Sequence, residues 1–464
     1  MSNLGAFAPI KQLSQNPTMK DFRLIIIGVL FCVLGSLSSS AQIRGNNIVV
    51  SVAPDHQDWN YKVGEKASFV VNVRKSGTLL DNVKVDYEAG PVMYPNVKKS
   101  VTLKDGTMKW SGEMKTPGFY RLKVVAHVGG KDYEGLCTAA FSPENITPFA
   151  QEPHGFDEFW KKALEEARAN DLNPTKVLLP ERCTKDVNVY EVSYNNNRWG
   201  SKMYGILSVP VKAGKYPALL RVPGAGVRPY AGDTYTASGK CIVLEIGVHG
   251  IPVTMPQKVY DDLANGELNS YWDTNLDNPQ KNAYKRIVTG AVRGVDFIAS
   301  LNEWDGKTLG VTGASQGGFL SLAVAALDKR VTFLAAVHDA MCDYEAELYG
   351  IAGGWPHYFY NEGKAFMKLA NKGNLAKLDN EVTKARVAGA RYYDGVNFAR
   401  RITVPGWYSF GYNDEVVPPT SAYGLYNTIK APKSLSIYQM TGHYWYQEQW
   451  DEWQDFLTKH LLGE

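Results

Sequence analysis

A serine flanked by two glycines is the feature of this sequence best suited to chemistry. It lies in Gly313-Ala-Ser-Gln-Gly317, after the apolar residues 308–312 and before the small-residue segment 318–327. These segments predict a strand and a helix, which would place Ser315 on a tight strand-to-helix turn with its hydroxyl exposed. Glycines two residues to either side allow the close backbone approach that such a turn needs. We interpret Ser315 as a nucleophile.

A serine hydroxyl attacks a carbonyl carbon only when a base removes its proton and an acid orients that base. After a turn of this kind, the acid and then the histidine follow the serine along the chain. The strand predicted at 404–410 leads into a turn that contains Asp414, and the strand predicted at 434–440 is followed by His443. We therefore predict that Ser315, Asp414 and His443 form a catalytic triad.

Other residues could take these two roles. Glu415 is the alternative acid, because it directly follows Asp414 in the same turn. His338 follows the strand predicted at 333–337, but it precedes Asp414 and so fits the expected order less well. The histidines that lack a suitable placement are His154, His249 and His357.

Acyl transfer also needs hydrogen-bond donors for the negative charge that develops on the carbonyl oxygen. The backbone N–H of Gln316, directly after the serine, is the expected first donor. The second is expected after the strand predicted at 218–222, in Pro223-Gly-Ala-Gly-Val227. We nominate the amide of Ala225, since Pro223 has no N–H. A plain strand-to-loop turn is the alternative reading of this segment.

The elements around these residues predict the fold class. After residue 153, strand patterns alternate with helical ones such as residues 284–302. The remaining predicted strands are 203–209 and 242–246. This alternation predicts an α/β fold with a mostly parallel central sheet flanked by helices, and with the serine turn it is typical of an α/β-hydrolase. Residues 341–393 show little strand pattern and are expected to cap the carboxyl ends of the strands.

The front of the chain has a different pattern. Residues 43–141 contain short alternating strands without helices between them, which predicts an immunoglobulin-like β-sandwich. Two prolines in residues 142–148 indicate a linker. We accordingly divide the chain into residues 1–41 (upstream start and signal peptide), 42–142 (sandwich), 143–152 (linker) and 153–464 (hydrolase).

The N-terminus has the layout of a signal peptide. From Met19, the basic Lys20 and Arg23 precede an apolar run at 24–37, and small residues end at Ala41. A membrane anchor is the alternative, but the run is shorter than the ~20 residues that a span needs. We expect cleavage after Ala41, export to the periplasm or the exterior, and no stable membrane insertion afterwards.

Composition excludes several classes of partner and cofactor. Fifty basic and 47 acidic residues among 464 give a net charge of +3, and no basic stripe indicates nucleic-acid binding. There is no Cys-x-x-Cys or His-Glu-x-x-His motif, so the sequence gives no support for a metal site and we predict none. No feature specifies an oligomeric state. The cysteines beyond the signal segment are Cys137, Cys183, Cys241 and Cys342, an even number that permits disulfides without indicating them.

Three segments resemble the acetyl xylan esterase and cephalosporin C deacetylase family: Gly-Ala-Ser-Gln-Gly-Gly at 313–318, Asn-Asp-Glu-Val-Val-Pro-Pro at 413–419, and the late Gly-His at 442–443. The resemblance covers roughly residues 153–462. It implies deacetylation of sugar esters without a cofactor, with Ser315, Asp414 and His443 at the triad positions. This chain departs from the family in two turns. Pro-Gly-Ala at 223–225 stands where typical members have His-Gly-Tyr, and His-Gly-Ile at 249–251 where they have Arg-Gly-Gln.

We therefore predict a serine carboxylesterase that acts on acetylated plant polysaccharides or oligosaccharides. A feruloyl-type esterase or a serine peptidase is the alternative within enzymes, because the same triad serves all three. A non-catalytic glycan-binding protein is the alternative from another class. Aromatic side chains that could line a sugar cleft are Trp272, Trp355, Tyr444, Trp445 and Tyr446. Core packing explains each of them equally well.

Overall fold

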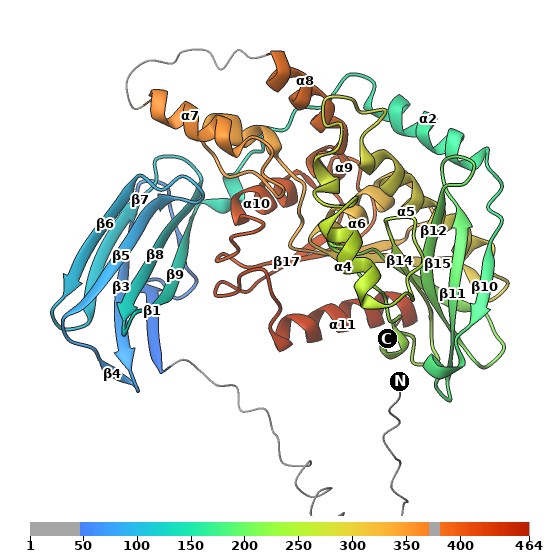
Figure 1. The fold of residues 1–464 in the computed structure, drawn as a ribbon, viewed down its shortest axis with the longest axis horizontal. Coiled ribbons are helices and arrows are strands. Elements are labelled where there is room, and N and C mark those ends of the chain that lie inside the picture. Colours follow the sequence, from blue (N-terminus) through green and yellow to red (C-terminus); the bar gives the residue numbers. More distant parts are fainter. Residues whose placement is uncertain (1–46, 371–380, 464) are drawn as a thin grey trace, which may run out of the picture. The chain divides into compact units, whose positions relative to one another are not determined.

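In the computed structural model, which describes residues 47–370 and 381–463, the later part of the chain forms a nine-stranded sheet (Figure 1). The strand order is β10-β11-β12-β14-β13-β15-β16-β17-β18. The three pairs from β10 to β14 are antiparallel, and the five pairs from β14 to β18 are parallel. The strands are β10 (Thr175–Leu178), β11 (Val187–Asn195), β12 (Lys202–Pro210), β13 (Tyr216–Arg221), β14 (Ile242–Gly247), β15 (Trp304–Ala314), β16 (Phe333–Val337), β17 (Gly406–Phe410) and β18 (Lys433–Ile437).

Alternate side chains of the parallel strands enter two different cores, as the two-residue period of a strand requires. Leu220 of β13 and Leu244 of β14 share one core with side chains of α2, α5 and α6. Their neighbours Leu219 and Val243 share the other core with side chains of α3 and α11. Helices thus cover both faces of the sheet. Their bounds are α2 (Phe156–Arg168), α3 (Thr234–Ala237), α5 (Ala283–Ala299), α6 (Gln316–Leu327) and α11 (Gln447–Leu462).

The other helices precede α5 or follow β16. They are α4 (Gln257–Asn265), α7 (Tyr360–Ala370), α8 (Glu381–Ala390), α9 (Gly395–Ala399) and α10 (Pro419–Thr428), with a 3-10 segment at Tyr344–Tyr349. The region predicted as a cap therefore contains helical segments and no strand among its described residues. Two predicted strands are shorter in the structure than in the sequence pattern. The strand predicted at 404–410 begins at Gly406, and the one predicted at 434–440 ends at Ile437, where a turn closed by Thr441 N and Tyr438 O follows.

The strands before residue 142 form two sheets that share one hydrophobic core. In one sheet β1, β3 and β4 are neighbours and β7 also pairs with β3, while the other has the order β2-β9-β8-β5-β6. The bounds are β1 (Ile48–Pro54), β2 (Asn60–Tyr61), β3 (Lys66–Lys75), β4 (Thr78–Leu79), β5 (Val83–Pro91), β6 (Val97–Leu103), β7 (Thr107–Glu113), β8 (Gly118–Val128) and β9 (Lys131–Phe141). We call β1–β9 the front sandwich (Figure 1). Ile48–Glu464 is one compact unit, so the predicted domain boundary stays a prediction.

Cys137, Cys183, Cys241 and Cys342 are all free thiols. The apolar run at 24–37 and the predicted cleavage point at Ala41 lie outside the described residues. Within the described part, no helix is both long enough and apolar enough to cross a membrane.

Candidate active site

Ser315 occupies the turn between the end of β15 and the start of α6. Its backbone has φ 62° and ψ −123°, a conformation that costs energy for a residue with a side chain and that is found mainly at functional sites. Its amide donates to the carbonyl oxygen of Val337, at the end of the neighbouring strand β16, over 2.8 Å. The sheet therefore holds the turn in its strained form, and Ser315 remains partly exposed.

The two flanking glycines are required by close packing. A Cβ atom added at Gly313 or at Gly317 would lie 2.5 Å from the carbonyl oxygen of Val222, at the end of β13. Because the obstructing atom belongs to the backbone, a side chain at either position forces the strand or the turn to move. The Gly-x-Ser-x-Gly spacing thus lets the serine turn pack directly against β13.

Gln316 links the serine turn to its surroundings through its side chain. Its Oε1 accepts hydrogen bonds from the hydroxyls of Tyr271 and Tyr284, and its Nε2 donates to the carbonyl oxygen of Pro223 over 3.3 Å. Its backbone N–H is the first of α6, so it has no acceptor within the helix and lies at the positive end of the helix dipole. That placement is suited to stabilising an oxyanion.

The loop after β13, which contains Ala225, packs against the serine turn. A Cβ atom added at Gly224 would lie 3.8 Å from Ser315 Cβ. Arg228 donates to the carbonyl oxygens of Ala225 and Gly224 over 2.8 and 3.2 Å. These bonds occupy the carbonyl oxygens of Ala225 and Gly224 and hold the loop in place.

His249, in the turn after β14, also supports this loop. Its Nε2 lies 2.9 Å from the carbonyl oxygen of Gly226 and its ring packs edge-on against Tyr271 at 4.6 Å between centroids. Burial lowers the pKa of His249 more than the hydrogen bond to Gly226 raises it. The neutral ring therefore donates its Nε2 proton to the loop.

Asp414 and His443 follow β17 and β18, which are neighbours in the sheet. His443 Nδ1 lies 2.8 Å from Asp414 Oδ2, and the amides of Val416 and Val417 each donate to Asp414 Oδ1 over 2.8 Å. The carboxylate is fully buried, whereas the His443 side chain is 27% exposed. The aspartate thus orients a histidine whose other ring nitrogen remains available to a reacting group.

The two loops meet at Gly411. A Cβ atom added there would lie 2.1 Å from the carbonyl oxygen of Thr441, two residues before His443. Only glycine allows this approach without moving the backbone, and the approach brings the loops of Asp414 and His443 together.

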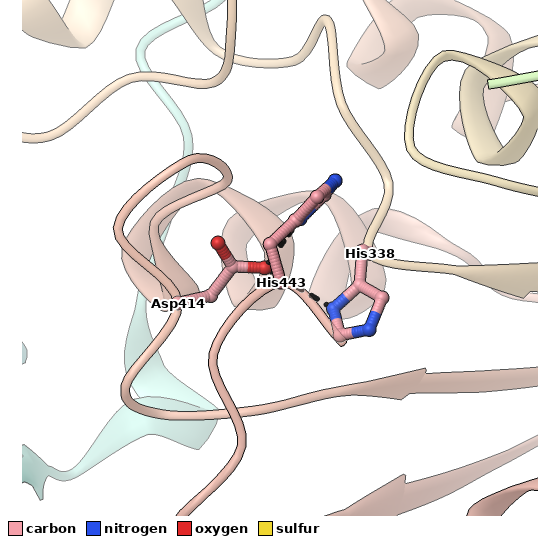
Figure 2. A group of neighbouring side chains, drawn as sticks. All are labelled: His338, Asp414 and His443. Carbon is pink, nitrogen blue, oxygen red and sulfur yellow. Dashed lines mark hydrogen bonds and ion pairs between the residues drawn. The ribbon is translucent and has the colours of Figure 1, made fainter. Parts of the chain in front are cut away.

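A second histidine, His338, flanks the same carboxylate (Figure 2). It follows β16 and is buried, and its Nδ1 lies 3.1 Å from Asp414 Oδ2, although its geometry does not qualify as a directed hydrogen bond. Burial raises the pKa of Asp414, but the interactions with His338 and His443 outweigh it and hold that pKa well below the usual range. Chain order favours His443 over His338 as the base, because His338 precedes the acid. The signal that points to His338 is its place at the end of β16, whose neighbour β17 precedes Asp414.

Among the described residues, His338, Asp414 and His443 form a group that could hold a metal ion. One atom from each residue lies within 4.8 Å of the others. Two imidazoles and a carboxylate are suitable ligands for a divalent cation. A cation there would occupy the Asp414 oxygen that accepts from His443, so metal binding and orientation of His443 compete for the same atom.

The Ser315 hydroxyl forms no hydrogen bond with His443 within the described residues. Such contacts are often long in unliganded enzymes and shorten when substrate binds. The structure therefore brings Asp414 and His443 together, and it sets Ser315 and Gln316 on the turn after β15.

A cavity of about 320 Å³ lies beside the serine turn. Its wall includes Gly224 and Ala314, together with three tryptophans whose rings contact one another: Trp445, Trp450 and Trp453. Of the five aromatic residues suggested by the sequence, Trp445 lines this cavity. Trp272 and Trp355 pack against the main core instead.

Comparison with known proteins identifies relatives of this chain. The family model for acetyl xylan esterase (AXE1) matches residues 144–460. The acetyl esterase Axe7A of Xylanibacter ruminicola is 36% identical over 445 residues, which are 94% of this chain and 95% of that protein.

Two solved structures are similar to this chain in fold. An acetyl xylan esterase from Paenibacillus sp. R4 has a TM-score of 0.57 and 24% identity, covering 69% of this chain and 98% of its own. Acetyl xylan esterase 1 from Thermoanaerobacterium sp. JW/SL YS485 has a TM-score of 0.53 and 24% identity, covering 69% and 97%. These similarities confirm the α/β-hydrolase fold predicted from the sequence.

Proposed function

The chain belongs to the acetyl xylan esterase family and is a carboxylic ester hydrolase, and from this premise we propose that it removes acetyl groups from acetylated xylan or related plant oligosaccharides by a serine mechanism. Ser315 is the nucleophile, His443 the general base and Asp414 the acid that orients it. The observation that carries the proposal is the 2.8 Å contact between His443 Nδ1 and the buried Asp414 carboxylate. A histidine held by Nδ1 presents Nε2 to the substrate side, as a general base must.

The reaction proceeds in two halves. His443 Nε2 takes the proton of Ser315 as Oγ attacks the acetyl carbonyl carbon, and the amides of Gln316 and Ala225 donate to the resulting oxyanion. The sugar oxygen then leaves with the proton from His443, which produces an acetyl-enzyme and a free sugar hydroxyl. Water, deprotonated by His443, attacks the acetyl carbonyl in the same way, and acetate leaves as Ser315 recovers its proton.

The test is acetate release from a panel of acetylated xylo-oligosaccharides, with feruloylated oligosaccharides and peptides as competing substrates. We expect Ser315→Ala to lower kcat by about 10⁴-fold or more, because the residual rate depends only on binding and oxyanion donors. A fluorophosphonate probe should label Ser315 in the wild type, and addition of EDTA should leave the rate unchanged. Equal rates for wild type and Ser315→Ala would disprove the serine mechanism.

The panel also tests the substrate class. Release of ferulate or cleavage of peptides without release of acetate would replace the proposed activity by one of its alternatives. Binding of the glycans with no hydrolysis and no labelling would favour a glycan-binding protein.

We further propose that the protein is exported after cleavage at Ala41, and that residues 42–142 and 153–464 are separate domains joined by residues 143–152. The family match begins at residue 144, immediately after the front sandwich, and this supports the boundary.

A further inference from the structure

The loop that carries Asp414 contacts the front sandwich at every one of its four residues. We call residues 412–415 the acid loop. The Tyr412 hydroxyl donates to Asn60 Oδ1 over 2.9 Å, and Asn413 Nδ2 donates to the carbonyl oxygen of Leu136 over 3.3 Å. The sandwich residues that contact the other two positions, Asp414 and Glu415, come from β8.

Arg121 of β8 makes the central contact. Its Nη2 donates to the carbonyl oxygens of Tyr412 and Asp414 over 3.0 and 2.9 Å. Its Nε donates to Thr138 Oγ1 over 2.7 Å, and its side chain is only 11% exposed. One guanidinium thus joins the backbone on both sides of Asn413 to the sheet of the sandwich.

Lys123 continues this contact two residues further along β8, on the same face of the strand. Its ammonium lies 3.0 Å from Glu415 Oε1 and 2.9 Å from Glu134 Oε1. Arg121 Nη1 lies 3.8 Å from the same Glu415 oxygen. Arg121 and Lys123 therefore both contact the acid loop.

Apolar packing also holds the acid loop. The Tyr412 ring meets Phe119 of β8 at a steep angle, with 5.0 Å between centroids. The two rings belong to a buried cluster that includes residues from both parts of the chain: Val92, Phe119, Ala140, Ile146, Ala352 and Tyr412. The acid loop is thus held by hydrogen bonds, ion pairs and a small shared core.

From these contacts we propose that Arg121 is a positioning residue for the esterase reaction, and that the front sandwich holds the Asp414 backbone so that its carboxylate faces His443. The inference rests on the proposed function, because it assigns Arg121 a role through Asp414. Buried carbonyl oxygens need donors, and Arg121 is the side chain that supplies one nitrogen to two of them. Without it the loop loses the bonds that set the direction of the Cα–Cβ bond of Asp414.

The experiment compares full-length Arg121→Met with the wild type in hydrolysis of p-nitrophenyl acetate, a probe that does not depend on glycan binding. We expect kcat to fall about ten- to hundredfold with KM changed by less than about twofold, as for a small displacement of a catalytic group. Arg121→Lys keeps the charge but not the planar fork, so its kcat should lie between those of the other two proteins. The matched control is Arg74→Met, on β3, whose guanidinium donates to Ser51 Oγ within the sandwich.

The variants also separate positioning from folding. Thermal unfolding reports the folded fraction at the assay temperature, and if Arg121→Met does not fold, Arg121→Lys serves as the test, with a loss confined to kcat expected. The inference is overturned if the folded variant keeps kcat within about twofold of the wild type, if the loss appears in KM alone, or if Arg74→Met loses as much.

Ser315→Ala, measured in the same assay, distinguishes failure of this inference from failure of the proposed function. Equal rates for wild type and Ser315→Ala would overturn both. An inactive Ser315→Ala beside a fully active Arg121→Met would overturn the role of Arg121 and leave the serine mechanism in place.

Discussion

The turn that carries Ser315 and the loop that carries Asp414 are fixed in different ways. The serine turn is held by its own sheet, through the bond from Ser315 N to Val337 O and the close approach of Gly313 and Gly317 to β13. The acid loop is held by side chains of the front sandwich, Arg121 and Lys123, almost 300 residues earlier in the chain. The serine turn is therefore held within the hydrolase sheet, whereas the acid loop also depends on contacts with the front sandwich.

This difference has a consequence for evolution of the site. In the serine turn, a side chain added at Gly313 or Gly317 would meet the backbone of Val222. A loop held by side chains of a neighbouring sandwich can be changed by substitutions in the sandwich, without any change in the strand-turn-helix that carries Ser315.

The largest effect should come from the acid itself. We expect Asp414→Asn to lower kcat by about 10⁴-fold, because an amide presents the wrong group to His443 Nδ1 and does not stabilise the imidazolium. Glu415→Gln is the matched control and decides between the two acids that the sequence offers. Since the Glu415 carboxylate contacts Lys123 and Arg121 rather than a histidine, its kcat should change by less than about tenfold. A larger loss for Glu415→Gln than for Asp414→Asn would reverse the assignment.

A smaller but still large effect is expected in the serine turn. Gly317→Ala places a Cβ atom 2.5 Å from Val222 O, so we expect about 1–3 kcal/mol of lost stability and a kcat about a hundredfold lower. Gly424→Ala in α10 is the control, because its nearest atoms lie at an ordinary 3.5 Å and alanine is the better helix former. Urea unfolding and p-nitrophenyl acetate turnover measure both quantities. Retention of wild-type turnover by Gly317→Ala would show that the turn is adaptable.

The sequence predicted the serine turn well because its signals are local. The strand, the glycines and the helix lie within about 20 residues, and periodicity with glycine spacing reports such features directly. The acid and the histidine were predicted from their order after two strands, and the structure brings Asp414 and His443 within hydrogen-bonding distance. The pattern at 434–440 predicts a strand that ends at residue 440, whereas β18 ends at Ile437, three residues earlier, and a turn follows.

The side chains that contact the acid loop and the Asp414 carboxylate could not be predicted from local signals. Arg121 is one of many basic residues on alternating strands, and nothing in its neighbourhood indicates a contact with residues 412–414. Chain order disfavours His338, because it precedes Asp414. In the fold, however, β16 and β17 are adjacent, so the histidine after β16 lies near the acid after β17. Contacts between distant segments depend on the assembled fold, so composition and periodicity do not contain them.

The smallest predicted effect concerns the loop that contains Ala225 and its dependence on pH. Burial is the main cause that lowers the pKa of His249 in the folded protein below its ordinary value of 6.5. Below about pH 6.5, His249 is therefore protonated more in the unfolded chain than in the folded protein. The stability that neutral His249 contributes is therefore present above about pH 6.5 and is lost as the pH falls toward the lower folded value. Asp339, whose pKa burial raises to about 7, changes stability in the opposite direction, because its contribution is lost as the pH rises.

Comparison of His249→Gln with the wild type separates these two groups, since both proteins retain Asp339. Between pH 7 and pH 5 we expect the Tm of the wild type to fall relative to that of His249→Gln by about 2 °C or less. His154→Gln, at an exposed position, is the matched control. Parallel Tm curves for His249→Gln and the wild type would mean that the loop does not depend on a neutral His249, and that the bonds from Arg228 are enough to hold it.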